Sequence, residues 1–335
     1  NGLSGGILYY DGQFDDARLA LNLAQTAVEK GATVLNYMEV FDVRKENGKS
    51  KGVFAEDTLT GKEYEIKSKA VINATGVFTD DVLQMDDDMQ HNIVSPSQGI
   101  HLVVDKKFFP GNYAMMIPRT DDGRVLFAVP WHHKVIIGTT DTPVAEALFE
   151  PRALEEEIEF IFRNVNRYLN SGITRSDVKA VFARLRPLFK APGQKNTALM
   201  PRDHTIIVSG SNLVTITGGK WTTYRKMAKV AVDNALFVAK LERKPCVTES
   251  LHIHGWCKAV NSSDPLHYYG ADAEAVKKLA EQNTVWQEKL HDAFPYIKAQ
   301  VIWAVRNEMA ITVEDVLARR IRMLFLDAHA ALQSA

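Results

Sequence analysis

The sequence predicts an α/β protein, α+β overall, in which a layer of helices and strands is interrupted by an antiparallel sheet and followed by helices. Three observations support this prediction. Apolar residues recur at helical spacing after Asp15 and again after Trp221. Four β-like runs with turn residues between them fill 95–143, and the chain beyond Pro245 reads as mostly helical. The 335 residues leave room for two or three domains.

The N-terminal part of the chain alternates between helix and strand patterns. The stretch NGLSGGILYYDGQ reads like the middle of a structural element, so we interpret 1–14 as a strand of a fragment whose beginning is missing. Asp15 and Gly31 suit the two ends of a helix. A strand (TVLNYMEVFDV) follows, then β-like runs broken by turns at ENGK and LTGK, and an apolar strand that ends in Gly76 (AVINATG). The residues expected on one face of the helix are Leu19, Leu23, Ala27 and Val28.

The middle of the chain consists mainly of β-like runs separated by turn residues. The runs GIHLVVD, YAMMIPR, RVLFAVPW and KVIIGTTD predict an antiparallel sheet, because FFPGN, TDDG and WHHK supply turns between them. We expect a helix over 150–169 and a returning strand at DVKAVFARLRPLF. A hairpin turning at Gly210-Ser211-Asn212 then leads into the long helix after Trp221. Near the C-terminus, Thr312 and Asp315 resemble a capping box.

Composition and charge exclude some classes of function. The chain is 46% hydrophobic and 24% charged with a net charge of −1, so it lacks the overall basic field of a nucleic-acid-binding protein. Cys246 and Cys257 form no CxxC and accompany no ligand spacing, so we expect free thiols and no metal site. No apolar run approaches the roughly 18 residues of a membrane-spanning helix, and no signal peptide is visible.

The turn Gly218-Gly219-Lys220 stands between an apolar strand and a helix, where phosphate-binding loops occur. A Walker A loop would need Gly in place of Val214 and Ser or Thr in place of Trp221, so a nucleoside triphosphatase is not expected. Two interpretations stay open. One is a plain structural turn with a solvated lysine. The other is a turn whose backbone and free N–H groups approach an anionic ligand.

The INATG turn leaves the same two interpretations open, a structural turn or a turn that contacts a ligand. Its small residues could admit a cofactor close to the backbone, or could simply be those that fit a tight turn; they are Ala74, Thr75 and Gly76.

His101 lies on the opposite strand face from its apolar neighbours Ile100 and Leu102. It is either a satisfied structural histidine or a proton acceptor, for which its usual pKa range is suited.

Three arginines form a candidate anion site. Arg184 and Arg186 alternate in FARLRPLF and would share one strand face, and Arg124 lies beside the DDG turn. A buried cation needs a partner, and a phosphate or carboxylate would match the planar guanidinium. For Arg124, a solvated turn residue is the alternative interpretation. For Arg186, whose neighbours are apolar, we favour a functional role.

Several strings, taken together and in order, resemble FAD-dependent glycerol-3-phosphate dehydrogenase. They are GGILYYDGQFDDARL, INATGVFTDDV, SQGIHLVV, DDGRVLFAVPW, IIGTTDTP, LRPL, TGGKWTTYRKMA and EDVLARRIRMLFLDA, and they cover nearly the whole chain. The resemblance implies an FAD/NAD(P)-binding-like layer with an inserted antiparallel-sheet substrate domain and a C-terminal helical domain. The implied segments are 1–14 (substrate-domain strand), 15–90 (partial FAD-binding domain), 91–199 (substrate domain), 200–244 (return of the FAD-binding domain) and 245–335 (C-terminal helical domain).

The resemblance also implies the chemistry. Glycerol 3-phosphate is oxidised to dihydroxyacetone phosphate, with a hydride passing to FAD and electrons going on to quinone or, in close relatives, to oxygen. Cations hold the phosphate and a base takes the hydroxyl proton. The implied catalytic residues are His101, Arg186 and Lys220, and the implied substrate ligands are Arg124, Arg186 and Lys220. The implied FAD contacts are Val40, Ala74, Thr75, Gly76, Gly218, Gly219, Lys220, Trp221 and Thr222.

Two departures from the family pattern matter. We find no strand–GxGxxG–helix unit, which cradles the FAD pyrophosphate in the family. We therefore expect this fragment alone to bind FAD weakly or not at all and to be inactive by itself; stoichiometric flavin in the purified chain would contradict that. In addition, Arg184 stands where relatives usually have Gly, which either alters the approach of flavin or substrate or adds a charge to the phosphate site.

Other interpretations stay open at the level of the sequence. They are an oxidase that uses oxygen, a non-catalytic phosphoester-binding relative, and an amine or amino-acid oxidase, against which the three cations argue. We expect a cytoplasmic protein. Peripheral attachment to the inner face of the cytoplasmic membrane through YRKMAKVAVDNALFVAKLERK, and a homodimer, are left open.

Overall fold

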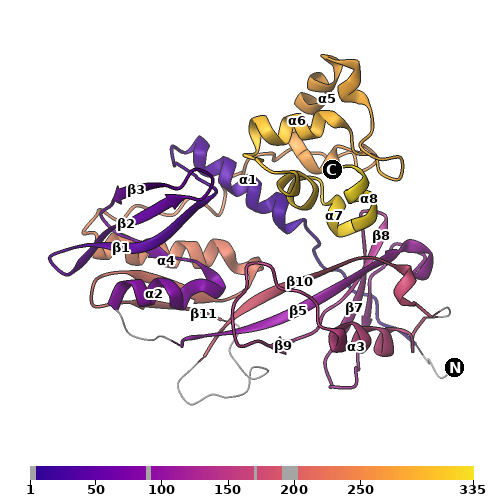
Figure 1. The fold of residues 1–335 in the computed structure, drawn as a ribbon, viewed down its shortest axis with the longest axis horizontal. Helices are drawn as coiled ribbons and strands as arrows, with labels where there is room; N and C mark the ends of the chain where they lie inside the picture. The colour runs from indigo at the N-terminus through magenta and orange to yellow at the C-terminus, as the bar shows by residue number, and fades with distance from the viewer. Residues whose placement is uncertain (1–4, 88–91, 170–171, 191–202) are drawn as a thin grey trace. The chain divides into compact units, whose positions relative to one another are not determined.

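The structure is a computed structural model that describes residues 5–87, 92–169, 172–190 and 203–335 (Figure 1). The chain forms two compact units. Unit 1 comprises Asn1–Val34, His252–Leu324 and His329–Ala335, and unit 2 comprises Leu35–Leu251 and Phe325–Ala328. The helices and the antiparallel and mixed sheets confirm the predicted α/β, α+β fold class.

The largest sheet of unit 2 runs in the order β10-β5-β8-β7-β6, with the short β9 paired beside β5. Every pairing in it is antiparallel, as the turn residues between the runs predicted. Its strands are β5 (Val94–Asp105), β6 (Met115–Ile117), β7 (Leu126–Trp131), β8 (Lys134–Gly138), β9 (Thr142–Pro143) and β10 (Val178–Phe189).

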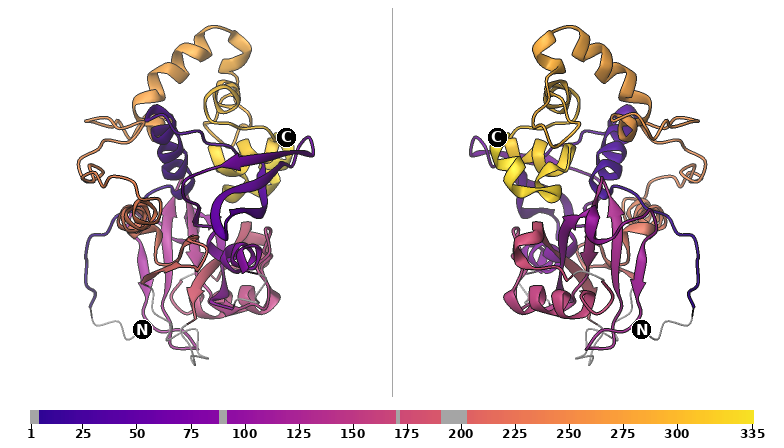
Figure 2. Two further views of the ribbon diagram at one scale, coloured as in Figure 1. Left: turned by 90° about the vertical axis from the view of Figure 1, so that its left-hand side faces the viewer. Right: turned by 90° about the vertical axis from the view of Figure 1, so that its right-hand side faces the viewer.

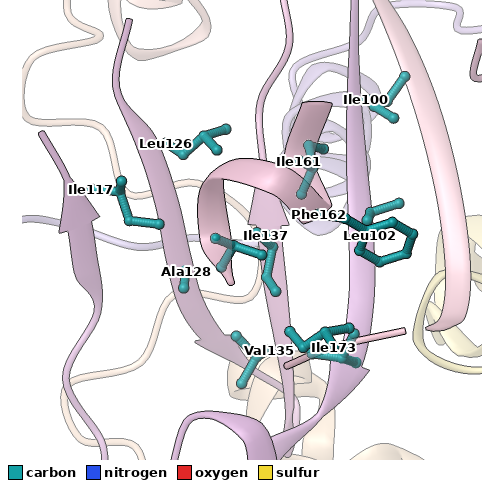
Figure 3. Packing of buried hydrophobic residues seen from close by; sticks show 12 residues of the cluster. Ile100, Leu102, Ile117, Leu126, Ala128, Val135, Ile137, Ile161, Phe162 and Ile173 are labelled. Carbon is teal, nitrogen blue, oxygen red and sulfur yellow. The ribbon is translucent and has the colours of Figure 1, made fainter. Parts of the chain in front are cut away.

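Helix α3 (Glu155–Val165) covers one face of this sheet. Figure 3 shows Ile161 and Phe162 of the helix packed toward Leu102 and Ile137 of the strands. Because side chains alternate along a strand, burying these apolar residues directs their neighbours to the opposite face. The helix is shorter than the predicted 150–169. It begins after Leu154, whose backbone N–H donates to the carboxylate of Glu157 at 3.0 Å.

Two smaller sheets complete unit 2. The first is the predicted antiparallel meander, whose first turn at Asn47 and Gly48 has the positive φ angles that hairpin turns require. The second joins the predicted hairpin β11–β12 to β4, which pairs parallel to β12. The elements are β1 (Met38–Glu46), β2 (Lys49–Asp57), β3 (Lys62–Lys67), β4 (Ile72–Asn73), β11 (His204–Val208), β12 (Val214–Gly218), α2 (Thr79–Asp87) and α4 (Tyr224–Val238).

Unit 1 is helical; Figure 2 shows α1 in indigo and α5, α6 and α8 in orange to yellow. The buried Arg18 of α1 pairs with Glu308 and donates to the carbonyl of Arg320 at 2.9 Å. This network connects α1 to the C-terminal helices. Residues 15–34 therefore belong to unit 1, whereas the predicted division placed them together with 35–90. The elements of unit 1 are α1 (Asp16–Glu29), α5 (Ala273–Glu281), α6 (Lys298–Asn307), the π-helical turn η8 (Asp315–Arg320) and most of α8 (Ala328–Gln333), while α7 (Met323–Leu326) is divided between the two units.

The structure corrects two local predictions. The strand predicted for 1–14 is wrong in its described part, since residues 5–14 are exposed and form neither strand nor helix. The helices expected directly after Pro245 begin only near His267, because Pro265 and the turn-forming Asn261-Ser262-Ser263 break the segment between. The predicted boundaries at 90/91 and 199/200 lie outside the described residues. The capping box at Thr312 and Asp315 is confirmed by hydrogen bonds in both directions.

Two further observations bear on the class of protein. Cys246 and Cys257 are both free, as predicted. Across the described ranges, we find no helix with the length and apolar character needed to cross a bilayer.

Replacing Asp15 by alanine should destabilise unit 1 by about 1 kcal/mol, the usual cost of losing a helix N-cap. The Asp15 carboxylate accepts from the N–H of Arg18 at 3.0 Å at the start of α1. Urea unfolding of the variant measures the loss. Asp11→Ala is the control, because the exposed Asp11 contacts only the next N–H. Equal stability of the two variants would show that the cap contributes nothing.

Candidate active site

The face of the main sheet opposite α3 carries the candidate site. The register pairs His101 with Gly138 on one side and Phe182 on the other, and Arg184 with Gly99. Directly opposed residues of antiparallel strands point to the same face. A Cβ at Gly138 would lie 2.5 Å from His101 Cδ2, and one at Gly99 would lie 2.4 Å from Arg186 Nη2. The two glycines therefore leave room for the imidazole and the guanidinium over the strands.

His101 is held in its neutral form. Its ring stacks on Phe182 at 5.1 Å between centroids, and Phe182 in turn contacts Phe325 at 5.0 Å. Burial, and then the positive charges of Arg184 and Arg186, lower the pKa of His101 to about 3. Its Nδ1 is buried and has no hydrogen-bond partner within the described ranges. A neutral imidazole with an unsatisfied nitrogen favours the functional interpretation of this residue over the structural one.

This lowered pKa predicts acid sensitivity. An unfolded histidine has a pKa near 6.5, so between about pH 6.5 and pH 3 the unfolded chain binds a proton that folded His101 does not. Stability should therefore fall as the pH drops through this window, by up to about 1.4 kcal/mol per pH unit, and should not depend on His101 above pH 7. Urea unfolding between pH 4 and 8 tests this. His101→Gln should show a shallower slope below pH 6, and parallel slopes would contradict the assigned pKa.

Two of the predicted arginines converge. Arg186 donates to Thr139 Oγ1 at 3.0 Å, to the Thr140 carbonyl at 3.1 Å and to Asp141 Oδ1 at 3.3 Å. Arg124 donates to the Asp141 carbonyl at 2.9 Å and also pairs with Asp122. The two guanidinium groups thus meet at one aspartate, although 62 positions separate them in the sequence. The side chain of Arg186 keeps 28% of its surface exposed, which leaves it accessible to a ligand.

A second feature is an open pocket of about 950 Å³, part of it solvent, between the ends of the strands and α4. Five predicted cofactor contacts line it: Ala74, Gly218, Gly219, Lys220 and Trp221. The lining is otherwise largely apolar: Ile72, Pro187, Ile216, Tyr224, Met227, Ala228, Ala231 and Val232. Pro187 of this lining directly follows Arg186 on β10.

The glycine turn explains why the pocket stays open. Gly218 and Gly219 have φ angles of +74° and +79°, a conformation that favours glycine. A Cβ at Gly219 would lie 2.5 Å from Met227 Sδ, so any side chain there would crowd α4. Lys220 is exposed, and its ammonium meets no acidic partner in the part of the chain that the structure describes. The turn thus presents backbone and one cation to a ligand.

Four of the predicted cofactor residues do not line the pocket. Thr75 and Gly76 follow Ala74, but Thr75 turns its hydroxyl back to Asn73 Oδ1 at 2.7 Å. Thr222 is exposed in the turn before α4. Val40 lies in the β1–β2 meander, opposite Ala55. A cofactor role for these four stays a prediction.

Sequence reasoning also missed residues. Asp141 lies in the string GTTD but was not a candidate, because nothing in the sequence shows that two distant arginines meet there. The apolar lining from α4 was missed as well, because that helix was considered as a possible membrane contact and not as the wall of a pocket. The available signal for Gly99 was its position two residues before His101 on the same predicted strand, which places both on one face.

Comparisons with known proteins agree with this geometry. The structure thus has a neutral imidazole beside converging arginines, and a largely apolar pocket at a glycine turn. Residues 1–225 match the family of FAD-dependent oxidoreductases, and residues 212–335 match the C-terminal domain of alpha-glycerophosphate oxidase. The chain belongs to the FAD-dependent oxidoreductase family.

Individual relatives carry more specific names than the family model. The mitochondrial glycerol-3-phosphate dehydrogenase of Mus musculus is 40% identical over 98% of this chain and 49% of its own length. The probable mitochondrial enzyme of Caenorhabditis elegans is 38% identical over the same shares. The glycerol-3-phosphate dehydrogenase of Bacillus halodurans, solved with FAD, superposes with a TM-score of 0.82 at 32% identity, over 95% of this chain and 66% of that one. The chain spans about half the length of the curated relatives it matches.

Proposed function

We propose that this chain carries the substrate site of an enzyme that oxidises glycerol 3-phosphate to dihydroxyacetone phosphate. The observation that carries the proposal is the meeting of Arg124 and Arg186 on the sheet face that also holds neutral His101. Arginine forks suit a phosphate dianion, and an unprotonated imidazole can accept a hydroxyl proton. The names of the relatives point to the same substrate.

The residues present fit an FAD cofactor. The glycine turn forms a cradle that a Cβ at Gly219 would fill, and the pocket beside it is lined mainly by apolar side chains. Ala74, Gly218, Gly219 and Trp221 would hold the cofactor there. When bound, FAD supplies the acceptor for the hydride that leaves carbon 2 of the substrate.

The chain's own residues bind, orient and deprotonate the substrate. Arg186 and Arg124 hold the phosphate, and Lys220 adds a third positive charge from the glycine turn. The hydroxyl proton at carbon 2 passes to the imidazole of His101. Removing this proton as the hydride leaves converts the alcohol into a ketone.

Substrate class is tested by dye-linked turnover of the FAD-loaded protein, in which a strand–GxGxxG–helix unit is supplied ahead of this chain because the chain alone is expected to bind FAD weakly. Glycerol 3-phosphate should reduce the dye, whereas glycine and a D-amino acid should not. Turnover with the amino acids alone would instead assign the arginines to a carboxylate. Binding of glycerol 3-phosphate without any turnover would favour the non-catalytic phosphoester-binding alternative.

The electron acceptor and the cellular setting are further parts of the proposal. We take quinone as the acceptor, with oxygen as the alternative, from the family resemblance. Comparing turnover with a soluble quinone analogue against oxygen consumption separates the two.

The basic helix α4 is the proposed contact for peripheral membrane attachment of a cytoplasmic protein, and vesicle co-sedimentation tests it. A homodimer is the proposed assembly, which sedimentation equilibrium would check.

A further inference from the structure

The loop 139–142, which follows β8, touches both candidate arginines. Thr139 Oγ1 and the Thr140 carbonyl accept from Arg186, and the Asp141 carbonyl accepts from Arg124. The Asp141 carboxylate accepts from Arg186 and from Ser97 of β5. Its other oxygen lies 3.9 Å from Arg124 Nη1. One short loop therefore contacts two cations, one from strand β10 and one from the turn before β7.

The loop is itself fastened from behind by Glu157 of α3. Glu157 is only 2% exposed, and no cation pairs with its carboxylate among the residues that the structure describes. It accepts from the hydroxyls of Thr140 and Thr142 at 2.7 Å each, and from Gln98 Nε2 at 2.7 Å. Burying a carboxylate is costly unless such donors satisfy it, and these donors come from the loop and from β5. The loop is thus held between a buried acceptor on one side and the arginines on the other.

Asp141 is poorly suited to contact a phosphate itself, since two negative charges repel each other. Its side chain is only 17% exposed and its oxygens already face donors. A carboxylate in this place can act on a phosphate only through the cations that it orients. Without it, the Arg186 fork would lose its acidic partner and would sample more rotamers before it binds a ligand.

We propose that Asp141 is a positioning residue that holds Arg124 and Arg186 in the arrangement that receives the substrate phosphate, with Glu157 fixing the loop that carries it. The inference rests on the proposed function of this site. It predicts that losing the Asp141 side chain weakens phosphate recognition and leaves the chemical step nearly unchanged.

The test is a double-mutant cycle in the FAD-loaded protein. Asp141→Ala should raise KM for glycerol 3-phosphate about 10-fold and change kcat less than about 3-fold. Asp141→Asn keeps an acceptor oxygen for Ser97 and Arg186, so it should stay within about 3-fold of the wild-type KM. Asp141→Ala should have a much smaller effect on KM once Arg186 is already alanine, because the aspartate side chain then acts only through its longer contact with Arg124.

Two other variants guard against a merely structural explanation. Gly99→Ala keeps Asp141 but places a Cβ 2.4 Å from Arg186 Nη2, so it should raise KM in the same way by displacing the guanidinium. Asp121→Ala is the matched control, because Asp121 pairs with Arg163 and Arg167 away from the loop. It should leave KM unchanged. Thermal unfolding of each variant identifies any loss of fold.

Calorimetric binding of glycerol 3-phosphate and of inorganic phosphate separates this inference from the proposed function. Weaker binding of both anions to Asp141→Ala and Gly99→Ala, with or without turnover in the wild type, supports the positioning role. Unchanged KM and binding in both variants would overturn it. So would an Asp141→Ala effect that persists in full when Arg186 is alanine, or a wild-type protein that binds neither anion.

Discussion

Arg186→Ala should raise KM for glycerol 3-phosphate about 10- to 100-fold and leave flavin content unchanged. Hydrogen bonds to a charged group contribute about 1.5–3 kcal/mol, and every 1.4 kcal/mol corresponds to a factor of ten. The Arg186 guanidinium is placed for this role because Gly99 leaves room for it and Asp141 and Thr139 orient it. Steady-state kinetics over a wide range of substrate concentration measures the effect.

Arg175→Ala is the matched control for that experiment. Arg175 is an exposed arginine of unit 2 that pairs with Glu155 and Glu159 on the α3 side of the sheet. Its loss should not alter KM. A wild-type KM in the Arg186→Ala protein would show that Arg186 does not bind the substrate phosphate, even if the predictions for the other residues hold.

His101→Ala should slow flavin reduction by about 10²- to 10⁴-fold, the usual contribution of a positioned general base, while FAD stays bound. The pKa of about 3 describes the unliganded site, in which burial, and then Arg184 and Arg186, oppose a positive charge on the ring. A bound phosphate dianion offsets those charges and so raises the basicity of His101 when it is needed. Stopped-flow reduction at saturating glycerol 3-phosphate isolates this step.

The control histidine is His133, an exposed residue at the β7–β8 hairpin tip with φ +65°. His133→Asn suits that conformation, because asparagine tolerates the left-handed region, and it should reduce at the wild-type rate. If His101→Ala also keeps the wild-type reduction rate, then another group or water accepts the proton.

Turn chemistry and alternation made much of the fold predictable. The meander, the four-run antiparallel sheet and the β11–β12 hairpin were marked by turn residues, mostly Gly, Asn and Asp and in one case the His pair of WHHK, and the structure confirms them. The N-terminal strand was wrong because β-like composition alone does not supply a partner strand for 5–14. The placement of α1 depended on the buried pair of Arg18 and Glu308, which are 290 positions apart and carry no local signal.

The same distinction applies to the site. The special geometry of Gly218-Gly219 could be inferred from neighbouring residues alone, whereas a functional role of Arg186 stays a prediction. The meeting of Arg124 with Arg186 at Asp141, and the support from Glu157, could not be inferred in this way. They depend on which strands become neighbours, and side-chain pairing across strands is set by tertiary register and not by spacing along the chain.

The central claim is that paired arginines select a phosphate ester for oxidation beside His101. Its most direct test adds glycerol 3-phosphate, or glycerol as the same secondary alcohol without phosphate, to the FAD-loaded protein under anaerobic conditions. We predict that glycerol 3-phosphate bleaches the flavin absorbance and yields dihydroxyacetone phosphate, whereas glycerol at the same concentration leaves the flavin oxidised. Flavin that stays oxidised with glycerol 3-phosphate, or that is bleached equally by glycerol, would contradict the claim.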